Sequence, residues 1–358
     1  MASTWPTEIA FLRDLVAIPS ISGHETPAAE FVEAAARRLG LDVVRDETSV
    51  RVSVGDELAG PTLALASHLD VVPPGEGWTR DPFTPVIEGD LLYGRGSGDA
   101  KASVSAMFWA IADLAAGRLP IRGRAMAIFA YGEETREATM PEAVPLAGRL
   151  DAVLIGEPTN LQLAVAQRGL MMVDLVARGD QRHAGYAASD GEFHNAITAL
   201  AREILKLDDI VAERVHPVLG ATTVTPTMLE AGVSRNVTPP SARAVLDIRS
   251  TPAWTHDELA AALRERLDCQ VVVTSTRLVP CETPADSRLL KAAQAAAPTA
   301  ECYGSPTCSD WCFLRHLDGI KVGPGTSRRS HTPDESVNLS EVTAARAFYA
   351  NVAGRYLA

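Results

Sequence analysis

The nine residues TLALASHLD occupy positions 62–70 of the chain. The segment from Thr62 to Ala66 is a short apolar run, which is typical of a central strand buried on both faces of an α/β sheet. His68 and Asp70 follow directly at the end of this strand. Open α/β sheets place their ligands at the carboxyl ends of strands, so this stretch predicts an α/β fold with a functional site near His68.

Acidic and imidazole side chains occupy similar positions elsewhere in the chain. They are Glu133 and Glu134 after a predicted buried strand at 125–130, Glu157 after another at 152–155, Asp99 in the Gly-rich turn 94–98 before a predicted helix at 101–115, and His331 in a loop of Gly, Pro and Ser. Taken singly, each residue is more often structural or solvated. Their recurrence at the ends of apolar strands favours a common metal site.

The number and type of these side chains fit two metal ions. Imidazole and carboxylate are the ligands of zinc in catalytic sites, and two neighbouring metals need a bridging carboxylate, for which Asp99 is suited. The predicted ligands of one metal are His68, Asp99 and Glu157. Those of the other are Asp99, Glu134 and His331. Zinc is the expected ion, although cobalt and manganese accept similar ligands.

Two further carboxylates lie beside these ligands in the sequence. Asp70 is suited to accept a hydrogen bond from the distal ring nitrogen of His68 and so to fix the tautomer of the imidazole. Glu133 remains as the general base, which takes the proton of the attacking water and passes it to the leaving amine. An alternative for the turn 94–98 is a phosphate cradle, although no P-loop Lys and Ser/Thr pair follows its last glycine.

The pattern of the chain changes after Glu157. Strands are predicted at 170–177, 222–233, 242–248 and 270–275, and helices at 195–205 and 255–267. The resulting order β-α-β-β-α-β is the split arrangement of ferredoxin-like domains. We therefore predict an inserted α+β domain at residues 168–280, with residues 1–167 and 281–358 together forming a larger α/β domain.

The remaining predicted elements belong to the larger domain. They are helices at 9–15, 27–39, 289–297 and from Ser340 onward, strands at 51–54 and 319–322, and a long structured loop at 73–90. The loop is rich in Pro and Gly, which do not favour a regular element there.

The composition limits the partners of the chain. It has 358 residues, 46% of them hydrophobic, and a formal net charge of −12. This charge argues against nucleic acid as a partner, because phosphate binding depends on clustered Lys and Arg. Residues 1–15 lack the pattern of a signal peptide, and the chain has no apolar run long enough to cross a membrane. We expect a cytoplasmic protein with neither nucleic acid nor membrane as its partner.

At these residues the chain resembles the acetylornithine deacetylase, succinyl-diaminopimelate desuccinylase and glutamate carboxypeptidase family of two-zinc metallohydrolases. The resemblance covers nearly the whole chain. It depends on the motifs SHLDVVP at 67–73, LYGRGSGDAK at 92–101, EE at 133–134, GEPT at 156–159 and SHTPDE at 330–335. It implies the metal ligands named above, a zinc-exopeptidase-like catalytic domain, and an inserted lid domain that in many members also forms a homodimer.

The resemblance also implies residues that contact the substrate. His183, in the motif RHAG at 182–185, matches a lid histidine that reaches the substrate carbonyl. In dimeric members this histidine comes from the neighbouring subunit, and such a donor can stabilise a developing oxyanion. Asn236 and Arg249 match family positions near the substrate. Arg249 is suited to clamp a carboxylate, and a structural role at a strand end is nearly as common for such an arginine.

Within the family, the best match is to acetylornithine deacetylase-like enzymes, which act on N2-acetylornithine in arginine biosynthesis. This match depends on residues 77–83, 304–310 and 323–331. It makes Asp310 and Arg328 the candidates for binding the amine and the carboxylate of the substrate, with Arg329 as an alternative to Arg328. The same chemistry on acetylcitrulline, acetyl-lysine, succinyl-ornithine, succinyl-diaminopimelate or a dipeptide stays open. A different class is a catalytically silent binding module.

Overall fold

The computed structural model describes residues 7–186 and 193–358. The chain forms two compact units. The first unit comprises residues 1–165, 283–303 and 309–358, and the inserted unit comprises residues 166–282 and 304–308. The role of the inserted unit as a lid and dimerisation domain stays a prediction.

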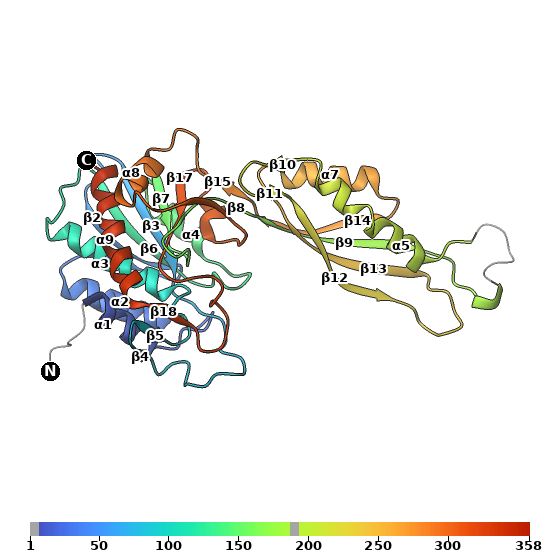
Figure 1. Ribbon diagram of the computed structural model, residues 1–358, viewed down its shortest axis with the longest axis horizontal. Coiled ribbons are helices and arrows are strands. Elements are labelled where there is room, and N and C mark those ends of the chain that lie inside the picture. Colours follow the sequence, from blue (N-terminus) through green and yellow to red (C-terminus); the bar gives the residue numbers. More distant parts are fainter. Residues whose placement is uncertain (1–6, 187–192) are drawn as a thin grey trace. The chain divides into compact units, whose positions relative to one another are not determined.

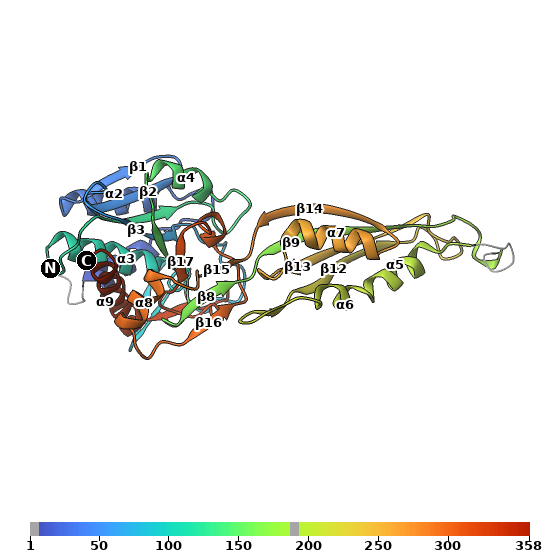
Figure 2. The ribbon, with the colours of Figure 1, turned by 90° about the horizontal axis from the view of Figure 1, so that it is seen from above.

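A mixed sheet of nine strands forms the centre of the first unit (Figures 1 and 2). In spatial order its strands are β1 (Asp42–Arg45), β2 (Ser49–Gly55), β6 (Arg124–Ala130), β3 (Thr62–His68), β7 (Ala152–Ile155), β17 (Asp318–Lys321), β8 (Leu163–Gln167) and β15 (Cys281–Glu282), and β16 (Cys302–Ser305) pairs with β8. A few residues of this sheet, in β8, β15 and β16, fall within the bounds of the inserted unit. The neighbours β6, β3, β7 and β17 are parallel to one another.

The central strands are buried as predicted. Every residue of β3 and of β7 is buried, and so is all of β6 after its first residue. Strands that are covered on both faces need apolar side chains on both, which is why these segments are continuous apolar runs. Because the strands are parallel, their carboxyl ends lie at one edge of the sheet.

Helices pack around this sheet and complete the hydrophobic core of the first unit. They are α1 (Thr7–Val16), α2 (Thr26–Arg38), α3 (Lys101–Ala115), α4 (Met140–Leu146), α8 (Arg288–Ala296) and α9 (Leu339–Tyr356). One buried cluster joins α1, α2, α3, α8 and α9 to the strands, and within it the ring of Phe11 stacks on that of Phe108 with centroids 4.6 Å apart. Among the described residues, no helix combines the length and the apolar character that crossing a bilayer requires.

The structure adds short elements that the sequence pattern does not predict. A three-stranded sheet joins β18 (Ser336–Asn338), β5 (Leu91–Tyr93) and β4 (Val86–Glu88). Strand β4 lies within the segment 73–90, so the prediction of a continuous loop there is wrong over these three residues. So short a strand depends on its partners in the sheet, which the local pattern does not reveal.

The inserted unit has the predicted ferredoxin-like order around a four-stranded antiparallel sheet (Figure 1). The strands, in spatial order, are β12 (Thr223–Ala231), β13 (Ser241–Arg249), β9 (Leu170–Arg178) and β14 (Gln270–Leu278). The other elements are α5 (Ala196–Ile204), α6 (Leu207–Val211), α7 (His256–Arg266), the short helix η1 (Ala184–Tyr186) and the hairpin of β10 (Val215–His216) and β11 (Gly220–Ala221). Alternate residues of β13 are buried in a core shared with α5, α6 and α7.

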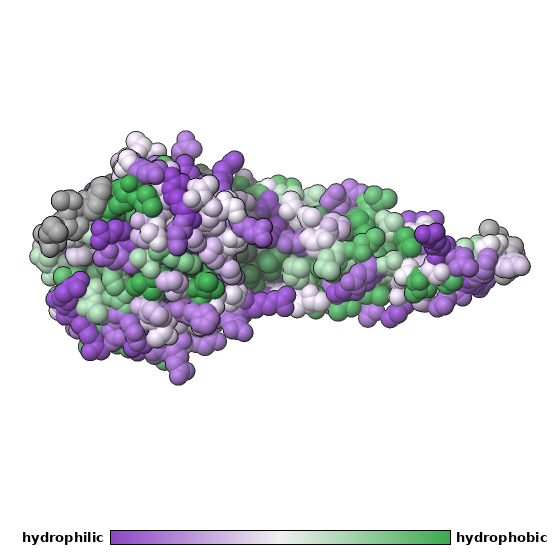
Figure 3. All heavy atoms as spheres, turned by 90° about the horizontal axis from the view of Figure 1, so that it is seen from below, coloured by the Kyte–Doolittle hydropathy of each residue, from purple (hydrophilic) through white to green (hydrophobic). Residues whose placement is uncertain are grey.

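Strand β12 forms one edge of this sheet and is exposed along nearly its whole length. Its residues Met228 and Leu229 are 54% and 62% exposed, and Val233, just after the strand, is 68% exposed. On the face shown in Figure 3, hydrophobic residues lie among hydrophilic ones over the inserted unit. An exposed edge strand with apolar side chains can pair with another chain, because the backbone donors and acceptors on its outer side are not used within its own sheet.

Asp46 stabilises the turn between β1 and β2. Its carboxylate accepts hydrogen bonds from the N–H groups of Thr48 and Ser49 at 2.9 and 3.2 Å, and it forms an ion pair with Arg51 at 2.6 Å. Burial raises the pKa of this carboxyl, but the hydrogen bonds and the Arg51 charge outweigh burial and lower the pKa from 3.8 to about 2. A lowered folded-state pKa adds stability above the unfolded value, and that stability is lost as the pH falls toward the folded value.

Asp46→Asn is therefore expected to lower the free energy of unfolding by about 1–2 kcal/mol at pH 7, and by less as the pH falls from 4 to 3. Urea unfolding at a series of pH values measures this difference. Asp42→Asn, at an exposed position of β1, is the matched control and should change stability by less than about 0.5 kcal/mol. An equal loss for Asp46→Asn at every pH would contradict the assignment.

Candidate metal centre

The predicted ligands converge at the carboxyl edge of the central strands of the first unit. His68 ends β3, Glu133 and Glu134 follow β6, Glu157 follows β7, Asp99 precedes α3, and His331 lies between β17 and β18. Three sets of these residues have ligand atoms within 4.8 Å of one another: His68, Asp99 and Glu157; Asp99, Glu134 and His331; and His68, Glu133 and Glu134. The first two sets have the same members as the sets predicted for the two metals.

His68 is the buried centre of the first set. Its Nε2 lies 3.4 Å from Oδ1 of Asp99 and 3.6 Å from Oε1 of Glu157. Oδ1 of Asp99 is buried and accepts no hydrogen bond within residues 7–186 and 193–358. One imidazole nitrogen and two carboxylate oxygens thus face one another, which is a donor set that zinc and similar ions accept. A cation among these atoms would satisfy the buried oxygen.

The second set joins Asp99 to Glu134 and His331. Nε2 of His331 lies 2.9 Å from Oε1 of Glu134 and 3.7 Å from Oδ2 of Asp99. Asp99 therefore offers one oxygen to each set, which is an arrangement that suits a bridging carboxylate. His331 has a φ of 62°, in the left-handed region that few residues other than glycine adopt. Backbone conformations of this kind cluster at functional sites.

Asp70 lies on the other side of the His68 ring. Nδ1 of His68 is 3.0 Å from the carbonyl oxygen of Asp70 and 3.4 Å from its Oδ1, so the carbonyl is the nearer acceptor. The Asp70 carboxylate also accepts hydrogen bonds from the N–H groups of Glu133 and Glu134, both at 3.0 Å, and from the Ser22 hydroxyl at 2.7 Å. Asp70 thus holds the loop after β6 as well as the histidine, which the sequence does not predict.

Two carboxyl groups of the centre, those of Glu133 and Glu157, lie in an environment that disfavours their charge. Burial and the charges of Glu157 and Asp310 raise the pKa of Glu133 well above its usual range, although His68 opposes the shift. Burial and the charge of Asp99 raise the pKa of Glu157 to about 8. Divalent cations would offset this repulsion, so the electrostatics of the centre fit bound metals.

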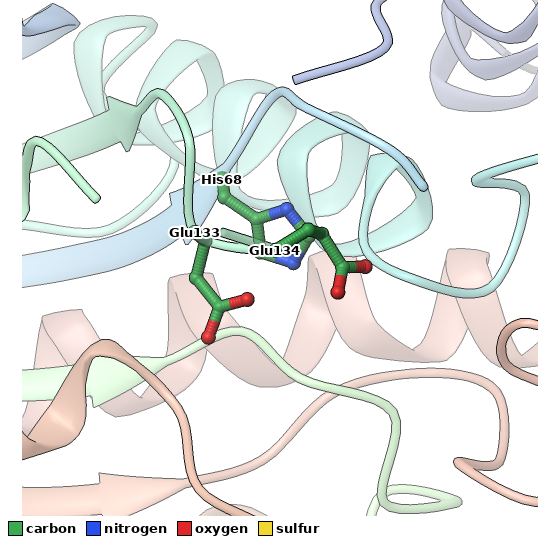
Figure 4. Close-up of side chains that lie close together, drawn as sticks. All are labelled: His68, Glu133 and Glu134. Atoms are coloured by element: carbon green, nitrogen blue, oxygen red, sulfur yellow. The ribbon is translucent and has the colours of Figure 1, made fainter. Parts of the chain in front are cut away.

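Figure 4 shows that the side chains of Glu133 and Glu134 diverge from the loop after β6. Their carboxyl groups point in different directions, with the His68 ring between them in this view. Glu134 reaches His331, whereas Glu133 has a ligand atom within 4.8 Å of those of His68 and Glu134 without belonging to either predicted metal set. This placement suits a base that acts beside the metals.

The Gly-rich turn 94–98 surrounds the carboxylate of Glu335, which is 1% exposed. This carboxylate accepts hydrogen bonds from the N–H groups of Gly96, Gly98 and Asp99 at 3.2, 2.9 and 3.0 Å. The alternative interpretation of the turn as a phosphate cradle is therefore wrong, because an internal carboxylate already uses these donors. The sequence places Glu335 in the motif at 330–335, and that position close to His331 is the signal that could have drawn attention to it.

The two substrate-binding candidates of the first unit lie in different surroundings. Asp310 begins the short helix η2 (Asp310–Phe313), is buried, and contributes to the raised pKa of Glu133. Arg328 is exposed in the loop before β18, whereas Arg329 donates a hydrogen bond to the Ser336 hydroxyl at 3.3 Å. Asp310 is thus close enough to act electrostatically on the centre, and Arg328 is accessible from solvent.

The remaining candidates, His183, Asn236 and Arg249, belong to the inserted unit. His183 is exposed beside η1, and the carbonyl of Asn236 accepts a hydrogen bond from the N–H group of Ala184 at 2.8 Å. Arg249 ends β13, at the opposite end of that strand from Asn236, and donates to both carboxylate oxygens of Asp247 at 2.7 and 3.0 Å. The structure brings His183 and Asn236 together but not Arg249.

Comparisons with known proteins support this interpretation. The model of peptidase family M20/M25/M40 matches residues 64–355. A protein of Methylorubrum extorquens named succinyl-diaminopimelate desuccinylase is 28% identical over 97% of this chain and 98% of its own. A LysW-lysine/LysW-ornithine hydrolase of Sulfurisphaera tokodaii is 28% identical over 95% and 93%. The crystal structure of the aminopeptidase PepT from Bacillus cereus superposes with a TM-score of 0.81 at 19% identity, covering 98% of each chain.

Proposed function

The chain belongs to peptidase family M20/M25/M40 and is a metal-dependent hydrolase of that family, and from this premise we propose that it hydrolyses the amide bond of an N-acyl amino acid. The observation that carries the proposal is the convergence of two metal-ligand sets on Asp99, with the additional carboxylate of Glu133 beside them. Amide hydrolysis needs an activated water, a group that moves its proton, and stabilisation of the oxyanion.

Two divalent metal ions, zinc first among them, are the proposed cofactors. His68, Asp99 and Glu157 would hold one ion, and Asp99, Glu134 and His331 would hold the other. The ions, when bound, supply a water of lowered pKa and polarise the acyl carbonyl. The protein contributes the spacing of the two sites, because His68, Glu134 and Glu157 lie at the ends of adjacent parallel strands and the single carboxylate of Asp99 belongs to both sets.

Glu133 is the proposed general base. Its carboxylate would take the proton of the attacking water and then return it to the leaving amine. Burial raises the pKa of Glu133 and so makes the carboxylate a better proton acceptor. The hydrogen bond from its N–H group to Asp70 fixes the backbone from which the side chain extends.

His183 is the proposed donor to the developing oxyanion, supplied across a homodimer. Its exposure leaves the imidazole accessible to a substrate, and the carbonyl of Asn236 anchors the adjacent Ala184. The exposed edge strand β12, with Met228 and Leu229, supplies a surface on which a second copy of the chain could pair.

The first substrate to consider is N2-acetylornithine, which would be converted to ornithine and acetate. Asp310 is the proposed partner of the substrate amine and Arg328 that of its carboxylate, because the buried acid lies near Glu133 and the arginine is exposed. A second candidate is N-succinyl-diaminopimelate. It is favoured by the similarity to the protein named succinyl-diaminopimelate desuccinylase, which is 28% identical over 97% of this chain.

The test is a hydrolysis screen of the chain after loading with zinc, cobalt or manganese. We expect release of the free amine from one or more N-acetyl or N-succinyl derivatives of ornithine, citrulline, lysine or diaminopimelate. Removing the metals with a chelator should abolish hydrolysis, and adding metal back should restore it, because the proposed mechanism depends on the bound metals to activate the attacking water. If no derivative or dipeptide were hydrolysed by protein that contains two metals per chain, a silent binding module would be the better description.

A further inference from the structure

Glu335 is enclosed by hydrogen-bond donors on both of its oxygens. Oε1 accepts hydrogen bonds from the N–H groups of Gly98 and Asp99. Oε2 accepts one from the N–H group of Gly96 and forms an ion pair with Nη1 of Arg95 at 2.5 Å. Neither oxygen faces the metal centre as a ligand atom in any of the three sets described above. Glu335 therefore acts on the backbone of the turn rather than on a metal.

The shape of this turn depends on its internal carboxylate. Gly96 has a φ of 80°, and a Cβ atom there would lie 2.4 Å from Cγ1 of Val71, so the turn is tightly packed on its outer side. On its inner side, three N–H groups meet at Glu335. Without an acceptor these buried donors would lose their hydrogen bonds, and the turn would have to open to reach water. Asp99 is the residue at which the turn ends.

Arg95 makes the burial of this carboxylate possible. Burial and the charge of Asp99 raise the pKa of Glu335, and Arg95 opposes that shift. The same guanidinium donates to the carbonyl of Pro74 at 3.1 Å and lies over the ring of Trp78, 5.1 Å from its centroid. The guanidinium of Arg95 thus joins its own segment, 94–99, to two other segments of the first unit, namely 74–78 and 330–336.

We propose that Glu335 is a positioning residue of the metal centre, whose carboxylate fixes the backbone at Asp99 so that the two oxygens of Asp99 face the two metal sites. This inference rests on the proposed function, because it takes Asp99 as the ligand shared by the two metals. Glu335 binds neither metal nor substrate. Its effect is transmitted through the N–H groups of the turn, as outer-shell partners orient ligands in other metal sites.

The test compares Glu335→Gln with the parent chain in metal affinity. The amide group would place an NH2 against the donors of Arg95 and Gly96, so the turn should shift and Asp99 with it. We expect the affinity for the more weakly bound Co²⁺ ion to fall by about 10- to 100-fold, and the visible absorption bands of the cobalt protein to change. Competition with a chromophoric chelator measures the affinity in protein that is verified as folded by circular dichroism.

Glu8→Gln is the matched control. Glu8 is a buried glutamate of the first unit whose carboxylate pairs with Arg346 at 2.6 Å and accepts a hydrogen bond from the Thr343 hydroxyl at 2.8 Å, and neither partner is a metal-ligand residue. This change should lower the melting temperature while leaving Co²⁺ affinity and spectrum as in the parent. A loss of stability alone therefore does not account for the result expected of Glu335→Gln.

A double variant, Arg95→Met with Glu335→Gln, covers the case in which Glu335→Gln leaves Arg95 as an unpaired buried charge and does not fold. Glu335→Asp, which keeps the charge but retracts the carboxylate by one methylene, is measured beside it. Parent-like Co²⁺ affinity and spectrum in any folded variant would overturn the positioning role. A parent chain that bound no metal would instead overturn the proposed function.

Discussion

Glu133→Gln is expected to lower kcat by about 10²- to 10⁴-fold, the range that loss of a general base produces. The amide has nearly the same shape as the carboxylate but cannot accept the proton of the attacking water. The backbone hydrogen bond from Glu133 to Asp70 does not involve the side chain, so the loop should keep its position. Metal content and KM are therefore expected to change little, with the loss confined to kcat.

The measurement is steady-state kinetics on whichever N-acyl amino acid the screen identifies, together with metal analysis of the same sample. Glu137→Gln is the matched control, because Glu137 is an exposed glutamate of the same loop. Its kcat should equal that of the parent chain. A Glu133→Gln variant that kept the full rate with two metals bound would exclude Glu133 as the base.

Asp99→Asn is expected to remove most of the metal from the protein and all measurable hydrolysis. One oxygen of Asp99 faces His68 and the other faces His331, so the change to an amide weakens both ligand sets at once. A neutral amide also fails to balance the charge of two divalent ions. The loss of affinity should exceed the roughly 10- to 100-fold that outer-shell changes produce.

Metal analysis after dialysis, with Co²⁺ titration of the metal-free protein, measures this effect. Asp81→Asn is a suitable control, because Asp81 is an exposed aspartate whose carboxylate accepts a hydrogen bond from the N–H group of Phe83 at 2.8 Å. That variant should bind metal as the parent does. If Asp99→Asn bound two ions with parent affinity, the assignment of Asp99 as the shared ligand would be wrong.

The sequence predicts those parts of the centre that depend on neighbours along the chain. His68 and Glu157 each come shortly after a continuous apolar run, and such a run identifies a buried parallel strand and therefore the edge at which it ends. The inserted unit was predictable for a similar reason, since its strands and helices have regular spacing. Its order of elements is sufficient to indicate the ferredoxin-like arrangement.

Contacts between distant segments could not be predicted in this way. The carboxylate of Glu335 accepts a hydrogen bond from the N–H group of Gly98, which is 237 positions away in the sequence. The carboxylate of Asp70 accepts one from the N–H group of Glu134, which is 64 positions away. Both contacts use backbone N–H groups as donors. Because nearly every residue has such a group, the sequence does not indicate which of them bonds to a distant carboxylate. Strand β15 has two residues, too few for any periodicity.

The substrate-binding candidates show a different limit. His183 and Arg328 are exposed, so no pattern of burial constrains either of them. The proposed roles of both come from family resemblance and stay predictions. Arg249 matches a family position, yet its guanidinium already pairs with Asp247 two residues earlier in the same strand.

The chain enters the inserted unit from β8 and returns through β15, and these two strands are antiparallel neighbours. Ala166 lies opposite Glu282, and Gln167 opposite Cys281. The whole segment 168–280 therefore connects two paired antiparallel strands, a connection that a short hairpin loop could also make. Closing a longer loop costs only slightly more entropy, and the strand register is set by the sheet rather than by what the loop contains. We therefore expect that segment 168–280 could be replaced by another insertion between β8 and β15. The strands that carry the metal ligands would keep their pairing.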